Sequence, residues 1–164
     1  DGIAYTVKSG TYTPSAVTAS HDLTSTYADV VGSSINYTPP AGTKLIIYKF
    51  ITSIFHAGKG IAHLKVVLGG DDVTDSRHTV GHTEDWADKG RRTIEWPFAI
   101  GGAANTDTGR LNAFSDWSSG LVIKVQAREY GGDYDASLHG TSYKDDGTGG
   151  NMFNRPLIGI TAIG

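Results

Sequence analysis

Cysteine and long hydrophobic runs are both missing from the chain, and each absence excludes a class of protein. Without cysteine the chain cannot form the disulfides that stabilise many small secreted domains, which favours assembly in a reducing cytosol. No stretch approaches the ~18 consecutive apolar residues of a membrane-spanning helix. We therefore expect no insertion into a membrane.

Charge of either sign is also scarce, since Asp, Glu, Lys and Arg together make up 19% of the residues. The formal net charge of −3 offers no basic footprint, so we expect no nucleic-acid partner. Strong helix formers are sparse, whereas glycine accounts for 22 of the 164 residues, well above its usual share of about 7%. This composition predicts short strands joined by many tight turns.

Catalytic motifs are absent as well. The sequence has no GxSxG or SxxK nucleophile motif, no P-loop and no dinucleotide-binding fingerprint. Acidic pairs at residues 71–72, 84–85 and 145–146 lie in glycine-containing loops, which can supply oxygen ligands to calcium, but they lack the ordered EF-hand spacing. We therefore expect that the protein is not an enzyme and that it holds no cofactor and no metal, with a loop calcium as the open alternative.

The sequence has six histidines, which are candidate metal ligands. His78 and His82 share a face of a predicted strand but lie about 13 Å apart at about 3.3 Å per residue, too far to chelate one ion. We interpret them as surface or partner-facing residues. His56, His63 and His139 could instead converge from adjacent strands and, in an oligomer, surround an axis.

The clearest pattern that is present begins at Leu121. From there apolar and polar side chains alternate for nine residues, which is the period of a half-buried β-strand. A Gly-Gly-Asp turn follows at residues 131–133, and a second alternating run occupies residues 138–143. The pattern predicts a hairpin over residues 121–143, with one apolar and one solvated face, around which we expect the other strands to be organised.

Residues 44–56 form the most hydrophobic strand candidate and are apolar on both faces. Leu45, Ile47 and Ile51 share one face, and the other is formed by Ile46, Tyr48, Phe50 and Ile54. Because only one face of a strand in a two-layer sandwich meets the core, the other face must be covered. Leu45, Ile47 and Ile51 are therefore candidate oligomer-interface residues; the alternative is a covering loop of the same chain.

Two further strands alternate in the same way. Residues 61–68 direct four apolar side chains inward and His63 and Lys65 outward, and residues 91–100 place Arg92, Ile94, Trp96, Phe98 and Ile100 on one face. Pro97 indicates an edge or a bulge. Together the patterns predict an antiparallel β-sandwich, of jelly-roll type, with about eight to ten strands. We expect a lead-in or edge strand at residues 1–20 and a single sandwich domain at residues 21–164.

Aromatic residues in loops are the remaining clue to function. Flat rings beside Asp, Asn and Gly are typical of surfaces that hold sugars, and they also commonly cap the end of a sandwich core. For Trp96 and Trp117 we expect the core role. The candidate ligand-binding residues are His82, Asp85, Trp86, Asp133 and Tyr134.

Five segments follow one another along the chain: VGSSINYTP (31–39), IAHLKVVLG (61–69), KVQAREYG (124–131), LHGTSY (138–143) and IGITAIG (158–164). Their order resembles the C-terminal domains of fibre-type or appendage-type structural proteins from the virions of marine bacteriophages. The resemblance covers residues from about 25 to 164, and it transfers no active site.

The resemblance implies a jelly-roll head domain that forms a homotrimer on the virion surface and binds a host-surface glycan or protein. Two alternatives stay open. One is a capsid decoration or adaptor protein that binds other virion proteins through its N-terminal residues. The other is a free carbohydrate-binding module.

Overall fold

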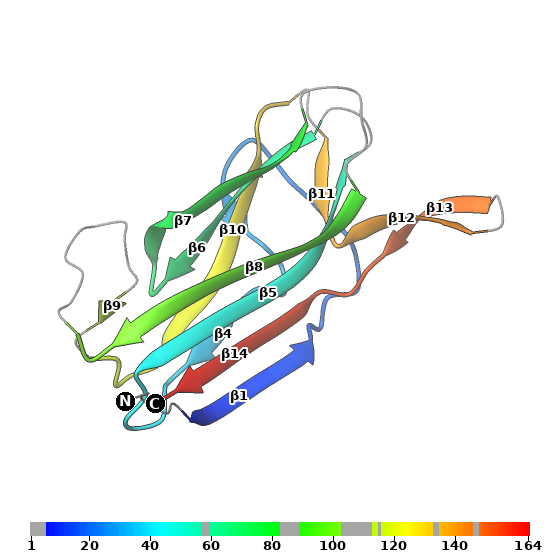
Figure 1. Cartoon of the computed structure of the whole chain (residues 1–164). Helices are drawn as coiled ribbons and strands as arrows, with labels where there is room; N and C mark the ends of the chain where they lie inside the picture. The colour runs from blue at the N-terminus through cyan, green and yellow to red at the C-terminus, as the bar shows by residue number, and fades with distance from the viewer. Residues whose placement is uncertain are drawn as a thin grey trace.

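Two antiparallel sheets packed face to face form a β-sandwich of jelly-roll-like arrangement in the computed structural model, as the sequence predicts (Figure 1). The structure describes residues 6–56, 60–82, 89–102, 113–114, 116–132, 135–145 and 148–164. Among these residues there is no helix, and accordingly none that could cross a membrane. The structure describes 14 strands, nine of them with six or more residues, which is more than the eight to ten that the sequence predicted.

Sheet A is built around β5, which pairs with β14 and β11 along one edge and with β8 along the other. β1 extends the sheet beyond β14, β2 pairs with β11, and β9 makes a short parallel pair with the end of β8. Its strands are β1 (Val7–Pro14), β2 (His21–Asp22), β5 (Leu45–His56), β8 (Lys89–Ile100), β9 (Ala113–Phe114), β11 (Ala136–Leu138) and β14 (Leu157–Ile163).

Sheet B is built around β10 and β6, with the long edge strand β7 beside β6 and the short strands β3 and β4 beside β10. Gly69 and Gly70 join β6 to β7 with φ angles of 61° and 104°, a tight turn that favours glycine. A separate pair, β12 with β13, projects from the sandwich (Figure 1). The strands are β3 (Ala28–Asp29), β4 (Ile35–Tyr37), β6 (Gly60–Leu68), β7 (Asp71–His82), β10 (Leu121–Glu129), β12 (Gly140–Asp145) and β13 (Thr148–Phe153).

The core lies between the two sheets and is filled by alternate residues of their long strands. The predicted inward faces of residues 44–56, 61–68 and 91–100 are confirmed. Trp117 is buried in the same core and donates its indole N–H to the Tyr37 carbonyl oxygen at 3.2 Å, as expected for a core aromatic. Fully buried core side chains include Ile46, Tyr48, Phe50, Ile54, Leu64, Val66, Phe98, Ile123, Val125 and Ile160.

The predicted hairpin over residues 121–143 is wrong. β10 forms as expected, but its partners are β3, β4 and β6 of sheet B, whereas β11 crosses to sheet A and pairs with β5 and β2. Both strands bury apolar side chains in the same core, Ala136 and Leu138 from the opposite layer. Alternation reports that one face is buried, and it does not report which sheet supplies the partner strand.

Residues 7–14 form the edge-strand option of the N-terminal segment. β1 pairs with β14 from Val7↔Ile163 to Pro14↔Leu157, with one irregularity between Val7 and Ser9. The carbonyl oxygen and N–H of Gly164 also bond to the backbone of Thr6. These residues therefore belong to the sandwich, while the division of the chain at residue 20 stays a prediction.

Candidate functional site

The outer surface of sheet A, which we call face A, carries many apolar side chains. The β5 register places Ile47 between Thr161 and Pro97, and Leu45 between Ile163 and Ala99. The predicted interface residues Leu45, Ile47 and Ile51 do share this outward face, and all three are partly exposed. The apolar members of face A are Val7, Tyr12, Leu45, Ile47, Ile51, Pro97, Ala99, Leu157 and Ile163.

A shallow hollow of about 450 Å³ lies at the centre of face A. Ile47 and Ile51 form part of its floor, and the half-exposed ring of Tyr12 stands at one side. Gly159 makes this possible, because a Cβ at that position would lie 2.5 Å from Cδ2 of Tyr12. The glycine therefore lets the tyrosine ring lie flat on the sheet, which extends the apolar surface from β5 to β1.

Lys49 and Glu95 form an ion pair on face A. Lys49 Nζ lies 2.6 Å from Glu95 Oε2, and this hydrogen bond raises the pKa of Lys49 above its ordinary value. Both side chains are about two-fifths exposed, and such pairs are worth about 0–1 kcal/mol. The pair borders the hollow, and Thr93 and Thr161 lie on the same outward face, so face A combines aliphatic with polar side chains.

The outer surface of sheet B, which we call face B, has a different composition. It consists of the outward side chains of β3, β6, β7 and β10, and many of them are charged. Lys124 Nζ donates to Asp29 Oδ2 at 2.7 Å, and Gln126 Nε2 donates to Asp29 Oδ1 at 2.9 Å. These two hydrogen bonds, that from Lys124 being the stronger influence, lower the pKa of Asp29.

A second carboxylate on face B joins two cations. Lys65 Nζ donates to both oxygens of Asp72, at 2.6 and 2.7 Å, and Arg77 donates to Oδ2 at 2.8 Å. Burial alone would raise the pKa of Asp72, but the hydrogen bonds and charges of Lys65 and Arg77 outweigh it and lower that pKa. The acidic pair at residues 71–72 therefore contributes an ion-pair network, so it does not support the calcium alternative.

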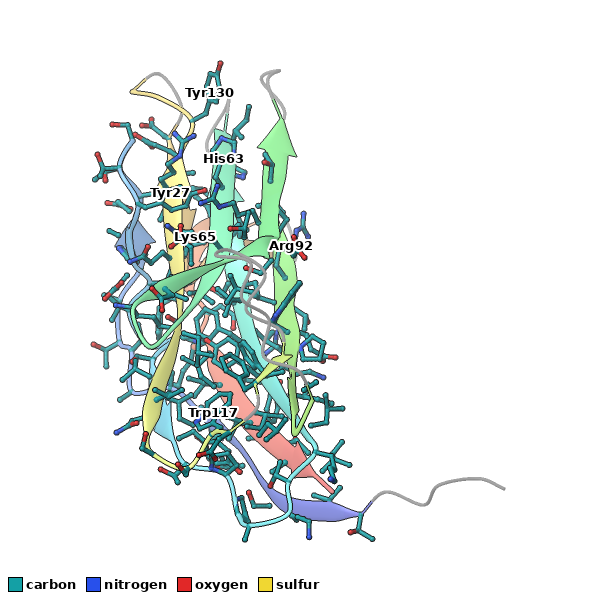
Figure 2. The ribbon with its side chains drawn as sticks, turned by 90° about the vertical axis from the view of Figure 1, so that its left-hand side faces the viewer. Tyr27, His63, Lys65, Arg92, Trp117 and Tyr130 are labelled. Carbon is teal, nitrogen blue, oxygen red and sulfur yellow. The ribbon has the colours of Figure 1, made fainter. Side chains whose placement is uncertain are left out.

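A group of aromatic and basic side chains lies near the upper end of face B, and we call Tyr27, His63, Lys65, Arg128 and Tyr130 the Tyr27 cluster (Figure 2). Lys65 Nζ lies 4.4 Å from the centre of the Tyr27 ring, and the Arg128 guanidinium carbon lies 5.4 Å from it. The rings of His63 and Tyr130 have centroids 6.1 Å apart. Such cation–π contacts contribute about 0.5–2 kcal/mol each.

The sequence pattern predicts the outward positions of several members of this cluster, but it does not predict that they meet. The outward positions of His63 and Lys65 were predicted and are confirmed. Tyr27 was missed because it precedes β3, a two-residue strand with no alternation of its own. Arg128 was placed on the polar side of its strand, but its aromatic neighbour comes from a segment about 100 residues earlier in the chain.

Most of the predicted ligand-binding residues cannot be placed. Asp85, Trp86, Asp133 and Tyr134 lie outside the described residues. His82 ends β7, where the backbone is described and the side chain is not. These five residues therefore stay a prediction from the sequence.

The three histidines that could have converged do not meet. His63 lies on face B with Nδ1 2.9 Å from Thr79 Oγ1, whereas His56 is buried on the inward face of β5. His139 is also buried, and its ring centroid lies 6.4 Å from that of His21. Among the described residues, no group of three or more His, Asp or Glu side chains could hold a metal ion.

His139 has a structural role instead. Its Nδ1 lies 2.8 Å from Thr52 Oγ1 and its Nε2 lies 3.0 Å from the Val31 carbonyl oxygen, so a neutral ring satisfies both partners. Burial lowers the pKa of His139 to about 4. The ring thus fastens β11 of sheet A to the turn that follows β3 of sheet B.

Comparison with known proteins adds no family to these observations: no protein-family model and no curated protein matches the chain. The contrast between face A and face B, together with the order of the sequence motifs, is what bears on function.

Proposed function

We propose that the chain is a structural subunit of a virion appendage, a homotrimer whose copies turn face A toward a common axis and whose other surfaces bind the host. Face A carries this proposal. Its central isoleucines are partly exposed and lie among further apolar side chains that come from four strands. Extended apolar patches on soluble proteins mark interaction surfaces. The motif resemblance supports the virion location and the three-fold number.

Rotational symmetry is compatible with this arrangement. In a cyclic trimer each contact is heterologous, so one part of face A would pack against a different part of face A of the next copy around the axis. The ion pair of Lys49 with Glu95 borders the hollow and would lie within the buried region or at its rim. An interface of this kind has an apolar centre and polar groups at the edge.

The decoration or adaptor alternative required N-terminal residues that become ordered only against another virion protein. β1 instead pairs along its length with β14 of its own sandwich, which argues against such an arm at Val7–Pro14. The carbohydrate-binding alternative is supported by a separate observation, the aromatic and basic Tyr27 cluster on face B. Both activities can exist in one subunit, because the two faces lie on opposite sides of the sandwich.

Light scattering on the purified chain tests the assembly directly. The proposal expects a mass of about three times the 17.4 kDa of one chain at micromolar concentration. A stable mass of two chains would retain the role of face A and correct the symmetry. A monodisperse 17.4 kDa species would contradict the proposal, because face A would then be exposed to water without a partner.

A further inference from the structure

A row of side chains crosses the central strands of face B. Strand pairing places Arg128 of β10 beside His63 of β6, and His63 beside Thr79 of β7. Tyr27 brings its ring over the Arg128 guanidinium from the other side. Tyr130 adds a second ring next to His63 (Figure 2). The row therefore joins two phenol rings, a guanidinium and an imidazole on one surface.

Arg128 differs from the other cations of this face. Lys65, Arg77 and Lys124 are each paired with Asp29 or Asp72. Arg128 donates to the Glu129 carbonyl oxygen at 3.2 Å, and no carboxylate in the described part of the chain pairs with it. The Tyr27 ring holds its guanidinium in place, which reduces the side-chain entropy that binding an anion would cost.

His63 carries a second polar group whose hydrogen bonding is incomplete. Its Nδ1 is bonded to Thr79, while its buried Nε2 has no hydrogen-bond partner within the described residues. Buried polar atoms of this kind are uncommon in folded proteins and call for an explanation such as a ligand or water. Next to it the Tyr130 side chain is 58% exposed, so its ring is accessible from solvent.

The position of the row in the sheet selects the kind of ligand. β10 and β6 are internal strands whose backbone groups already pair on both sides, so a peptide cannot bind here by adding a strand. Tyr130 follows the last residue of β10 and is two residues from Arg128, about 7 Å away if the chain stays extended there. That separation suits one sugar ring, with a C–H face on the tyrosine and an acidic substituent on the arginine.

We propose that face B binds a carboxylated sugar through Arg128, Tyr130, His63 and Tyr27. The carboxylate accepts hydrogen bonds from the Arg128 guanidinium, the planar fork that matches it. The sugar ring stacks on Tyr130, whose ring lies beside that of His63. This inference rests on the binding part of the proposed function and deepens it by naming the ligand class and the residues.

Titration calorimetry with galacturonic acid oligomers tests the site. Wild-type protein should bind these oligomers and should not bind neutral galactose oligomers of equal length. Arg128→Gln should weaken binding by at least about tenfold, because a charge-assisted hydrogen bond is lost. Arg128→Lys, which keeps the charge without the fork, should fall between the two, and Tyr130→Ala should weaken binding by about three- to tenfold.

Lys124→Gln is the matched control, since Lys124 lies on the same strand and face but is already paired with Asp29. The affinity of the Lys124→Gln variant for galacturonic acid oligomers should stay within about twofold of the wild-type affinity. An equal loss in Lys124→Gln would overturn the site, because attraction would then come from the general charge of the face. Failure of wild type to bind galacturonic acid oligomers, or equal binding of galactose oligomers or poly-glutamate, would overturn the ligand class.

The same samples separate this inference from the assembly. Light scattering on each titrated sample reports the oligomeric mass, and the residues of face B lie on the opposite side of the sandwich from face A. A trimer without affinity for acidic sugars would overturn the inference and leave the assembly intact. A monomer that binds acidic sugars through Arg128 would support the inference and contradict the trimeric assembly.

Discussion

Face A and face B are outer surfaces of the same sandwich, but their side chains differ in how favourably they interact with water. Both consist of every second residue of strands whose other residues fill the core. On face A many of those residues are aliphatic, and Lys49 and Glu95 form an exposed ion pair among them. On face B they are cations, carboxylates and aromatic rings joined by hydrogen bonds. The polar groups of face B are hydrogen-bonded and tolerate contact with water. Covering the aliphatic side chains of face A with a second surface would lower the free energy of the system.

The comparison also shows what strand alternation leaves undetermined. The inward residues of β5 and β6 are mostly apolar, and both sets are buried in the core. Only the outward residues distinguish a solvated sheet from one that meets a partner. Changes at outward positions should therefore affect assembly and binding, and changes between the sheets should affect folding.

The largest expected effect is on assembly. Ile47→Asp places a charge at the centre of face A, and its burial in an interface would be unfavourable, so association should weaken by at least about 100-fold. Light scattering should show monomers. Val122→Asp is the matched control, because Val122 is an outward and 39% exposed residue of β10 on face B. If both variants kept the wild-type mass, face A would not be the interface.

The layer between the faces should respond to acid. The pKa of His139 is about 4 in the fold, below its ordinary 6.5, so the unfolded chain binds the proton first as pH falls. The stability due to the neutral ring is complete above pH 6.5 and is lost on going down to pH 4, by about 3 kcal/mol in total. Burial also lowers the pKa of His21, although the charge of Asp22 opposes this shift. The lowered pKa of His21 makes stability fall with pH in the same direction as that of His139.

Chemical denaturation at several pH values measures this loss. His139→Gln should be less stable than wild type at pH 7 and should show a shallower decline between pH 6.5 and 4. A wild-type stability that stayed constant over this range would show that His139 does not stay neutral in the fold.

The smallest expected effect compares the ion pairs of the two faces. Asp72→Asn leaves the mostly buried Lys65 without its carboxylate and should cost about 2 kcal/mol in the free energy of unfolding. Glu95→Gln breaks the exposed pair with Lys49 on face A and should cost less than about 1 kcal/mol. Equal costs in urea denaturation would mean that burial does not separate the two pairs.

Much of the fold could be predicted from the sequence, because alternation depends on local chemistry. The faces of β5, β6 and β8, the Gly69–Gly70 turn and the core position of Trp117 all follow from residue types and their spacing. The sequence predicts Pro97 at an edge or bulge, and within the described part of the chain β5 is the only strand that pairs with β8 at that position. These features need no knowledge of distant contacts.

The candidate sites were harder to predict, because they depend on contacts between distant segments. The Tyr27 ring meets Arg128 across about 100 residues of sequence, and no local pattern marks that pair. The crossing of β11 to sheet A depends on the whole core, which explains why the predicted hairpin failed. The idea that His56, His63 and His139 converge failed for a related reason: their spacing in sequence does not encode which layer each one faces.

The central claim is that face A is covered in the assembled protein and face B is open. Because the chain has no cysteine, single thiols can be introduced at Ile51→Cys on face A and Val122→Cys on face B, and their rates of alkylation compared. The account predicts that the Ile51→Cys thiol reacts at least about tenfold more slowly, and that adding Ile47→Asp removes the difference. Equal rates in the assembled protein, without Ile47→Asp, would contradict the claim.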